Sequence, residues 1–268
     1  MRVEAIVLDW AGTAVDFGCF APVNVFLQIF EDKGVPVTLE EARKPMGMLK
    51  IDHIRTMLEM PRINEAWEQV HGQAYKEEDI QAMYTAFEAK LMESLATYTD
   101  PIPHVIDTVA TLKSAGIRIG STTGYTDSMM AVVTKNAEIK GYKPDFLVTP
   151  DQVGNIGRPY PYMIFKNMEE LGIQSTKQVV KVGDTTSDIR EALNAGVWAV
   201  GVIIGSSEMG LSEREFMALS EAAKQSIIAR TKRVFEETGA HYTIQTMAEL
   251  PVLLETINER LEQELVVS

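Results

Sequence analysis

The sequence predicts an α/β fold, a Rossmann-like doubly wound parallel sheet with an inserted α-helical cap domain, and three observations support this prediction. Short β-branched runs alternate with stretches of helix length along most of the chain, which is typical of a parallel sheet covered by helices on both faces. Between residues 16 and 101 the β pattern disappears and the sequence becomes helical. Polar residues follow the ends of the β runs, where open α/β sheets bind their ligands.

Five short apolar runs are the predicted strands of the core sheet. Each is rich in β-branched residues and is followed by a loop with polar side chains. A sixth run near the carboxyl end has the length of an edge strand, and an amphipathic helix is predicted to follow it from Met247. The predicted strands are residues 3–8, 117–121, 146–148, 179–182, 198–203 and, at the edge, 241–244.

Residues 17–100 are predicted to form the helical cap, and residues 1–16 and 101–268 the α/β core. The cap segment is rich in Met, Glu, Ala and Gln, and Thr38 with Glu41 gives the capping-box pattern that begins a helix. Because two connections at its base join the cap to the core, we expect it to swing over the ligand edge of the sheet as a lid.

Residues 20–30 are apolar nearly all round, with Asn24 and Gln28 marking a narrow polar face. A helix that packs on one side only needs a narrower apolar stripe. The run therefore predicts either a helix at the centre of the cap or a helix buried between subunits, and the pattern supports both equally.

Composition and charge argue against several classes of protein. The chain has a formal net charge of −13, which disfavours nucleic acid or an anionic membrane surface as the main partner. Cys19 is the only cysteine, so no intrachain disulfide can form and a reducing cytosol fits. The longest apolar run, residues 196–205, is too short to cross a bilayer. We expect a soluble, cytoplasmic protein.

The first predicted strand leads into Asp9-Trp-Ala-Gly-Thr13, which places a carboxylate at the ligand edge of the sheet. Haloacid-dehalogenase-type phosphatases begin with a similar Asp-x-Asp-x-Thr pattern, in which the first Asp attacks phosphorus and the second protonates the leaving oxygen. Here Ala11 stands in place of the second Asp. The leaving group should therefore differ from a simple alkoxide, or its proton should come from elsewhere, and Lys50 is the best candidate for an additional catalyst.

Five motifs occur in order across most of the chain, and together they are far more specific than any one alone. They are Asp-Trp-Ala-Gly-Thr at 9–13, Lys-Pro-Met-Gly-Met-Leu-Lys-Ile-Asp-His at 44–53, Gly-Ser-Thr-Thr-Gly-Tyr at 120–125, Gly-Arg-Pro-Tyr-Pro at 157–161 and Lys-Val-Gly-Asp-Thr at 181–185. This combination resembles the phosphonoacetaldehyde hydrolases, a branch of the haloacid dehalogenase superfamily.

Three further residues are candidates for binding a phosphoryl group. The Thr123 hydroxyl can donate to a phosphoryl oxygen, Gly124 lets the backbone approach closely, and the fork of Arg158 can bind two oxygens at once. In isolation, Thr123 and Gly124 fit an ordinary strand-to-helix turn about equally well, and a lone arginine is more often part of a surface ion pair. The resemblance selects Thr123 over Thr122 as the phosphate contact.

Asp184 and Asp188 follow the strand at 179–182 and are expected to lie near Asp9. Three carboxylates around a phosphonate dianion repel one another, and a divalent cation would relieve this repulsion. Oxygen ligands without a Cys or His cluster favour Mg²⁺ over zinc. The resemblance implies Asp9, Asp184 and the Ala11 carbonyl as ligands. Asp188 is assigned a supporting role, either orienting Arg158 or orienting a metal-bound water.

Lys50 is predicted to form a Schiff base with an aldehyde substrate, because the resulting iminium can accept the electrons of a breaking carbon–phosphorus bond. A lysine attacks as the neutral amine, so burial should lower its pKa, with Arg43 and Lys44 as further sources of repulsion. His53 lies three residues later, on the same helical face if the segment is helical, and is a candidate proton shuttle. The resemblance also places Met46, Cys19 and Tyr125 in the pocket.

The leading functional hypothesis is hydrolysis of phosphonoacetaldehyde to acetaldehyde and phosphate in phosphonate degradation, through the Lys50 Schiff base and an aspartyl-phosphate at Asp9. The resemblance further implies a homodimer formed through the caps. An ordinary phosphate-ester phosphatase or phosphosugar mutase is the enzymatic alternative, although both would favour a carboxylate at position 11. A catalytically idle scaffold that binds partners through its cap and acidic surface is the alternative from a different class.

Overall fold

The computed structural model describes residues 1–267 and contains a five-stranded sheet in which all neighbours are parallel. The strand order β2-β1-β3-β4-β5 places the first strand inside the sheet, and the short last strand lies at one edge, as the sequence predicted. The strands are β1 (Ala5–Leu8), β2 (Arg118–Ser121), β3 (Val179–Gly183), β4 (Trp198–Val202) and β5 (Tyr242–Ile244).

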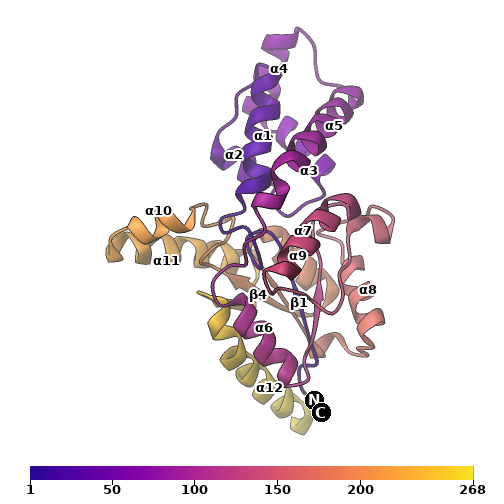
Figure 1. The fold of residues 1–268 in the computed structure, drawn as a ribbon, viewed down its shortest axis with the longest axis vertical. Helices are drawn as coiled ribbons and strands as arrows, with labels where there is room; N and C mark the ends of the chain where they lie inside the picture. Colours follow the sequence, from indigo (N-terminus) through magenta and orange to yellow (C-terminus); the bar gives the residue numbers. More distant parts are fainter. Residues whose placement is uncertain (268) are drawn as a thin grey trace.

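Helices cover both faces of this sheet, which confirms the doubly wound class (Figure 1). Alternate residues of β1 point to opposite faces, as the period of a strand requires: Ile6 and Leu8 join one buried cluster, Ala5 and Val7 the other. The first cluster includes helices α6 (Val105–Ser114), α7 (Asp127–Ile139) and α12 (Leu250–Val267), and the second includes α8 (Tyr162–Leu171), α9 (Thr186–Ala195) and α11 (Glu221–Thr238).

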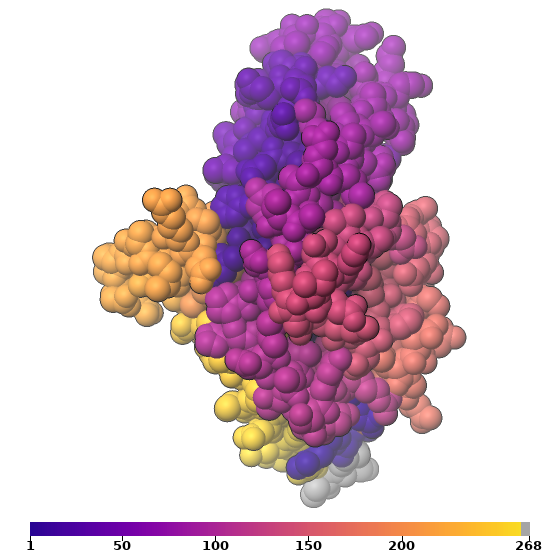
Figure 2. Space-filling view, viewed as in Figure 1, coloured from indigo at the N-terminus to yellow at the C-terminus, as the bar shows by residue number. Residues whose placement is uncertain are grey.

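The inserted cap is helical, and its helices lie together above the sheet at the top of Figures 1 and 2. Its first helix packs against the longest one through a ring stack of Phe26 on Phe87, with centroids 4.4 Å apart. The predicted capping box of Thr38 and Glu41 is present. The elements are α1 (Phe20–Asp32), α2 (Leu39–Arg43), α3 (Lys50–Leu58), α4 (Pro61–His71), α5 (Glu77–Ser94) and the short η1 (Leu95–Thr97).

The apolar side chains of α1 pack inside the cap. Within one protomer, residues 20–30 therefore form a helix at the centre of the cap, the first of the two interpretations. Phe26 and Phe30 are fully buried, while Asn24 and Gln28 lie on the exposed side. The two connections of the cap lie next to each other, since the amide of Asp16 donates to the carbonyl of Asp100 at 3.2 Å. The division after residues 16 and 100 remains a prediction.

One predicted strand is wrong. Residues 146–148 run beside β2 and form only an isolated bridge between Thr122 and Val148. Pro144 and Pro150 flank the run, and because proline has no N–H to donate, the ladder cannot extend in either direction. Helix α10 (Glu213–Ala218) and the start of α11 project from the core as the orange arm of Figure 2. Within residues 1–267, no helix has the length and apolarity needed to cross a membrane.

Candidate active site

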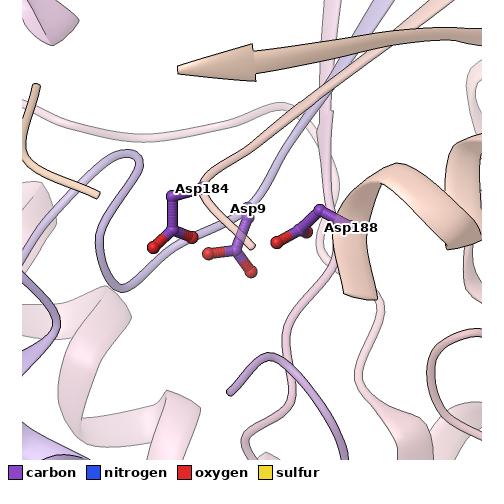
Figure 3. A group of neighbouring side chains, drawn as sticks. All are labelled: Asp9, Asp184 and Asp188. Atoms are coloured by element: carbon purple, nitrogen blue, oxygen red, sulfur yellow. The ribbon is translucent and has the colours of Figure 1, made fainter. Parts of the chain in front are cut away.

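Three carboxylates meet at the carboxyl edge of the sheet (Figure 3). Asp9 follows β1, Asp184 follows β3, and Asp188 lies in the first turn of α9. One oxygen from each lies within 4.8 Å of the others, and all three residues are buried. The strand register brings Asp9 and Asp184 together, because Leu8 pairs directly with Val182 and the segments that follow β1 and β3 leave the sheet side by side.

Local hydrogen bonds hold the carboxylates of Asp184 and Asp188 in place. The Asp184 carboxylate accepts hydrogen bonds from the Ser207 amide at 2.8 Å and the Thr13 hydroxyl at 3.2 Å. Asp188 accepts from the Thr185 hydroxyl at 2.6 Å as part of a capping box. Gly12 has φ +93°, and a Cβ there would overlap the Asp184 carboxylate at 2.1 Å, so the turn after Asp9 requires glycine.

The electrostatics separate these three groups. Burial raises the pKa of Asp184 well above its usual value, and Asp9 and Asp188 raise it further. Burial also raises the pKa of Asp9, although Arg158 opposes the change. For Asp188, burial is outweighed by Arg158 and Lys181, which hold its pKa below the usual value. Asp9 and Asp184 therefore carry unfavourable negative charge that a cation would stabilise.

The residues present fit a hard divalent cation. The donor set consists only of oxygen, and a buried pair with raised pKa values is where a cation gains most. Asp188 already faces the two cationic side chains of Arg158 and Lys181, at 3.2 and 2.9 Å from its Oδ1. This leaves Asp9 and Asp184 as the side chains best able to hold the ion, and Ala11 lines the same cavity.

Arg158 joins the nucleophile candidate to a buried ion network. Its Nη2 lies 2.7 Å from Asp9 Oδ1 and its Nη1 3.2 Å from Asp188 Oδ1. Its Nε lies 2.9 Å from Glu191 Oε2. The surrounding carboxylates outweigh burial and raise the pKa of Arg158, so it remains a cation. Arg158 also contacts the cap, where its Nη1 donates to the Gly47 carbonyl at 3.4 Å.

Sequence reasoning missed three residues of this network. Lys181 on β3 is buried, with Nζ 2.9 Å from Asp188 Oδ1 and 3.5 Å from Glu191 Oε2. The Thr122 hydroxyl accepts from Arg158 and Lys181 and donates to Glu191, so its hydrogen-bonding capacity is filled. A lysine inside an otherwise apolar predicted strand was the available signal.

Thr123 and Gly124 differ from Thr122 in facing the cavity. The Thr123 oxygen accepts from the Tyr125 amide at 3.1 Å, which leaves its proton available for a ligand. Gly124 also has a packing role, because a Cβ there would come within 2.6 Å of the Met48 carbonyl of the cap. The backbones of cap and core touch at this glycine.

Lys50 is the first residue of α3, and the cap places it over the carboxylates. Its side chain is buried at 3% exposure, with Nζ 5.2 Å from the centre of the Tyr125 ring. Burial lowers the pKa of Lys50 and outweighs the opposing effects of Cys19 and Asp9. The cation that lowers this pKa further is Arg158. Arg43, suggested from sequence for that role, instead directs its Nη1 to the Gly18 carbonyl and Ser207.

His53 lies one turn behind Lys50 and does not line the cavity. Its ring stacks on Phe26 with centroids 3.8 Å apart, and its Nε2 lies 2.9 Å from the Ala42 carbonyl. A carbonyl only accepts, so Nε2 carries the proton and Nδ1 keeps a lone pair. Burial, followed by the charge of Lys50, lowers the pKa of His53 well below its usual value.

One cavity of about 20 Å³ brings most of the predicted site together, and it has room for about one water. Asp188 and His53 lie outside its lining, whereas Gly47 and Thr185 are additional members. A hollow of about 820 Å³ beside the two connections of the cap is larger but contains none of the predicted site residues. The predicted residues that line the small cavity are Asp9, Ala11, Cys19, Met46, Lys50, Thr123, Gly124, Tyr125, Arg158 and Asp184.

The chain is similar to known proteins along its whole length. A family model described as haloacid dehalogenase-like hydrolase matches residues 3–196. A phosphonoacetaldehyde hydrolase of Lysinibacillus sphaericus is 75% identical over 264 residues, which are 98% of each chain. A phosphonoacetaldehyde hydrolase of Bacillus cereus is 53% identical over 269 residues, covering all of both chains.

Solved structures agree with these sequence matches. The crystal structure of a phosphonoacetaldehyde hydrolase-like protein from Oleispira antarctica superposes with a TM-score of 0.95 at 39% identity, covering 98% of this chain and 95% of that one. A β-phosphoglucomutase from Clostridium difficile gives a TM-score of 0.70 at 16% identity, covering 97% of this chain and 99% of the other. The second likeness is one of fold alone.

Proposed function

The chain belongs to the phosphonoacetaldehyde hydrolases among the haloacid dehalogenase-like hydrolases, and from this premise we propose that it hydrolyses phosphonoacetaldehyde to acetaldehyde and phosphate. The observation that carries the proposal is that a buried amine, Lys50, and a buried carboxylate, Asp9, line one small cavity. Ala11 supplies no acid for an ester oxygen, whereas the amine offers an electron sink for a carbon leaving group.

The reaction begins with neutral Lys50, which attacks the aldehyde carbon to give a carbinolamine. The carbinolamine takes up a proton and loses water to give an iminium. Burial favours the neutral amine by lowering the pKa of Lys50. Asp9 then attacks phosphorus, and the electrons of the carbon–phosphorus bond move into the iminium to leave an enamine on Lys50. Protonation at carbon and hydrolysis of the resulting iminium release acetaldehyde, and water releases phosphate from Asp9.

The phosphoryl group is held by donors that surround Asp9. Arg158 is a cation with its Nη2 2.7 Å from Asp9 Oδ1, so an oxygen on phosphorus bonded to Asp9 would lie within reach of its fork. Thr123 and the Gly124 backbone complete the binding side of the cavity. Asp9, Asp184 and the Ala11 carbonyl would hold Mg²⁺, which supplies charge stabilisation at the phosphoryl oxygens. Asp188 supports Arg158.

We further propose that His53 assists proton transfer at the imine through the lone pair on Nδ1, which has no hydrogen-bond partner among the described residues. Its position next to Lys50 on α3 supports this role, and its stacking on Phe26 would hold the ring in place. Met46, Cys19 and Tyr125 would shape the pocket around the aldehyde. Assembly as a homodimer through the caps and a cytoplasmic location belong to the same proposal.

The test incubates the purified protein with phosphonoacetaldehyde and Mg²⁺ and measures phosphate and acetaldehyde together. Equal release of both products is expected, with near-complete loss in Lys50→Arg, which keeps a positive charge but provides no nucleophilic amine. Borohydride should inactivate the wild type only when the aldehyde is present. Release of phosphate from simple phosphate esters, with none from phosphonoacetaldehyde, would instead identify an ordinary phosphatase.

A further inference from the structure

The closed cap has to open for a substrate to enter. The cavity beside Lys50 has room for about one water, and the Lys50 side chain is nearly sealed from solvent. An organic phosphonate is much larger than one water. A contact that forms only when the cap is closed therefore stabilises the closed state, in which Lys50 lines the cavity.

Arg43, the last residue of cap helix α2, makes such a contact. Its Nη1 donates to the Gly18 carbonyl at 2.6 Å, in the connection between core and cap. The same nitrogen reaches the Ser207 hydroxyl at 3.2 Å and the Ser207 carbonyl at 3.4 Å. One guanidinium thus joins the cap, its connection and a loop of the core.

The core loop that receives Arg43 is part of the proposed metal site. The Ser207 amide donates to Asp184 Oδ2 at 2.8 Å, while the Ser207 hydroxyl accepts a hydrogen bond from Arg43. The connection is tied to the same loop, since the Gly18 amide donates to the Gly205 carbonyl at 2.7 Å. Arg43 therefore connects cap helix α2 directly to the loop that anchors Asp184.

We infer that Arg43 is a positioning residue that latches the closed cap onto the core and so holds Lys50 at the cavity. The inference rests on the proposed function for the roles of Lys50 and Asp184. Its geometry is suited to a latch, because the guanidinium also lies 4.7 Å from the centre of the Phe20 ring and its stem passes Gly210. All three hydrogen bonds come from Nη1, so one cationic nitrogen contacts the carbonyl and hydroxyl oxygens of both segments.

The experiment measures how fast a small amine-acetylating reagent labels Lys50 without substrate, by peptide mass spectrometry, with exposed Lys44 as the internal standard. We expect Arg43→Met to accelerate labelling of Lys50 about tenfold, the effect of losing one or two hydrogen bonds from a charged donor. Arg43→Lys keeps the charge but loses the fork, so it should give an intermediate rate. The hydrolytic kcat/KM should fall in the same order.

Arg62→Met is the matched control, because Arg62 is also a cap arginine and its hydrogen bonds within residues 1–267 go to Glu41 and Pro36, both in the cap. It should leave the labelling of Lys50 unchanged. Wild-type labelling of Lys50 in Arg43→Met, or equal acceleration in Arg62→Met, would overturn the latch. Should Arg43→Met fail to fold, as judged by circular dichroism, Arg43→Lys carries the same test. Labelling needs no turnover, so its outcome is independent of whether phosphonoacetaldehyde is the substrate.

Discussion

Lys50 shows how a single residue can be unfavourable for stability and still be kept. Its folded pKa is lowered by burial, so the folded state disfavours the ammonium. The resulting destabilisation is fully present below the folded pKa and disappears as the pH rises towards the unfolded value of 10.5. The lowered pKa favours the neutral amine that the proposed mechanism needs, and active-site residues commonly reduce stability in this way.

Lys50→Met should therefore abolish hydrolysis and increase stability by about 0.5 to 2 kcal/mol at pH 6. The gain in stability should be smaller at pH 9.5. The free-energy cost of the lowered pKa decreases as the pH approaches the unfolded value of 10.5. Urea unfolding of both proteins at the two pH values measures this. A gain that is as large at pH 9.5 as at pH 6 would contradict the assignment of a lowered pKa.

Unlike Lys50, Lys181 is expected to stabilise the folded state, because its charge is paired with Asp188 and Glu191 in a buried network. Lys181→Met keeps the length of the side chain but leaves these carboxylates with Arg158 as their remaining cation. We expect a loss of about 3 to 5 kcal/mol in the free energy of unfolding, the usual result of breaking a buried pair. Lys166→Met, which removes an exposed pair with Glu170, should change it by less than about 1 kcal/mol. Similar losses in the two variants would show that the network is not needed.

The sequence was informative about residues whose chemistry depends on a motif and uninformative about residues whose role depends on partners. Asp9, Lys50 and Arg158 could be assigned because each belongs to a motif of fixed spacing, and all three line the cavity. Glu191 could not be assigned, since its role comes from contacts with Thr122 after β2, with Lys181 on β3 and with Arg158. No pattern within α9 distinguishes it from a glutamate on a solvated face.

Among the elements, the strands buried on both faces were the easiest to predict. β1 is a continuous apolar run followed by Asp9, and β3 is apolar except for Lys181 and is followed by Asp184. The run at 146–148 has similar composition, but its pairing was limited by prolines on both sides. The contact between the cap and Gly124 could not be foreseen, because it depends on how two separately folded segments dock.

The contact between Gly124 and the cap loop predicts the effect of a larger residue at position 124. Gly124→Ala places a Cβ within 2.6 Å of the Met48 carbonyl and 3.1 Å of the Gly47 carbonyl, which should push the cap loop away from the core. Displacement by about 1 Å can reduce catalysis about 100-fold, so kcat/KM should fall by roughly that factor. Gly157→Ala is the control, since its Cβ would make only ordinary contacts of 3.5 Å or more. Equal kinetics in the two variants would exclude Gly124 as a docking position.

For the whole molecule, the proposed metal site links activity to stability. Mg²⁺ should raise the free energy of unfolding by about 2.7 kcal/mol at 100 times its dissociation constant, and a chelator should remove both this gain and the activity. Asp184→Asn should lose the response to Mg²⁺ and be more stable than the metal-free wild type at pH 7, because burial and Asp9 raise the pKa of Asp184. Thermal melts with and without Mg²⁺ measure this, with the exposed Asp107→Asn as control. A full Mg²⁺ response in Asp184→Asn would place the ion elsewhere.

The proposed dimer is also tested on the whole molecule. Sedimentation velocity at micromolar concentration should give a species of twice the 29.8 kDa chain mass. The apolar residues of α1 are already covered within the cap, so the contact would have to use other cap surfaces. A species of a single chain mass across the concentration range would contradict the dimer.

The pairing at the base of the cap has a consequence for how such proteins diversify. Val15 bridges Pro101, and the Asp16 amide bonds to the Asp100 carbonyl, so the inserted segment leaves and returns at neighbouring points. To the sheet, the whole insertion is a single closed loop, and the entropy of closing a loop grows only slowly with its length. A longer, shorter or differently shaped insertion can thus occupy the same two attachment points without moving the strands that hold Asp9 and Asp184. Phosphoryl chemistry and the choice of substrate are thereby free to evolve as separate modules.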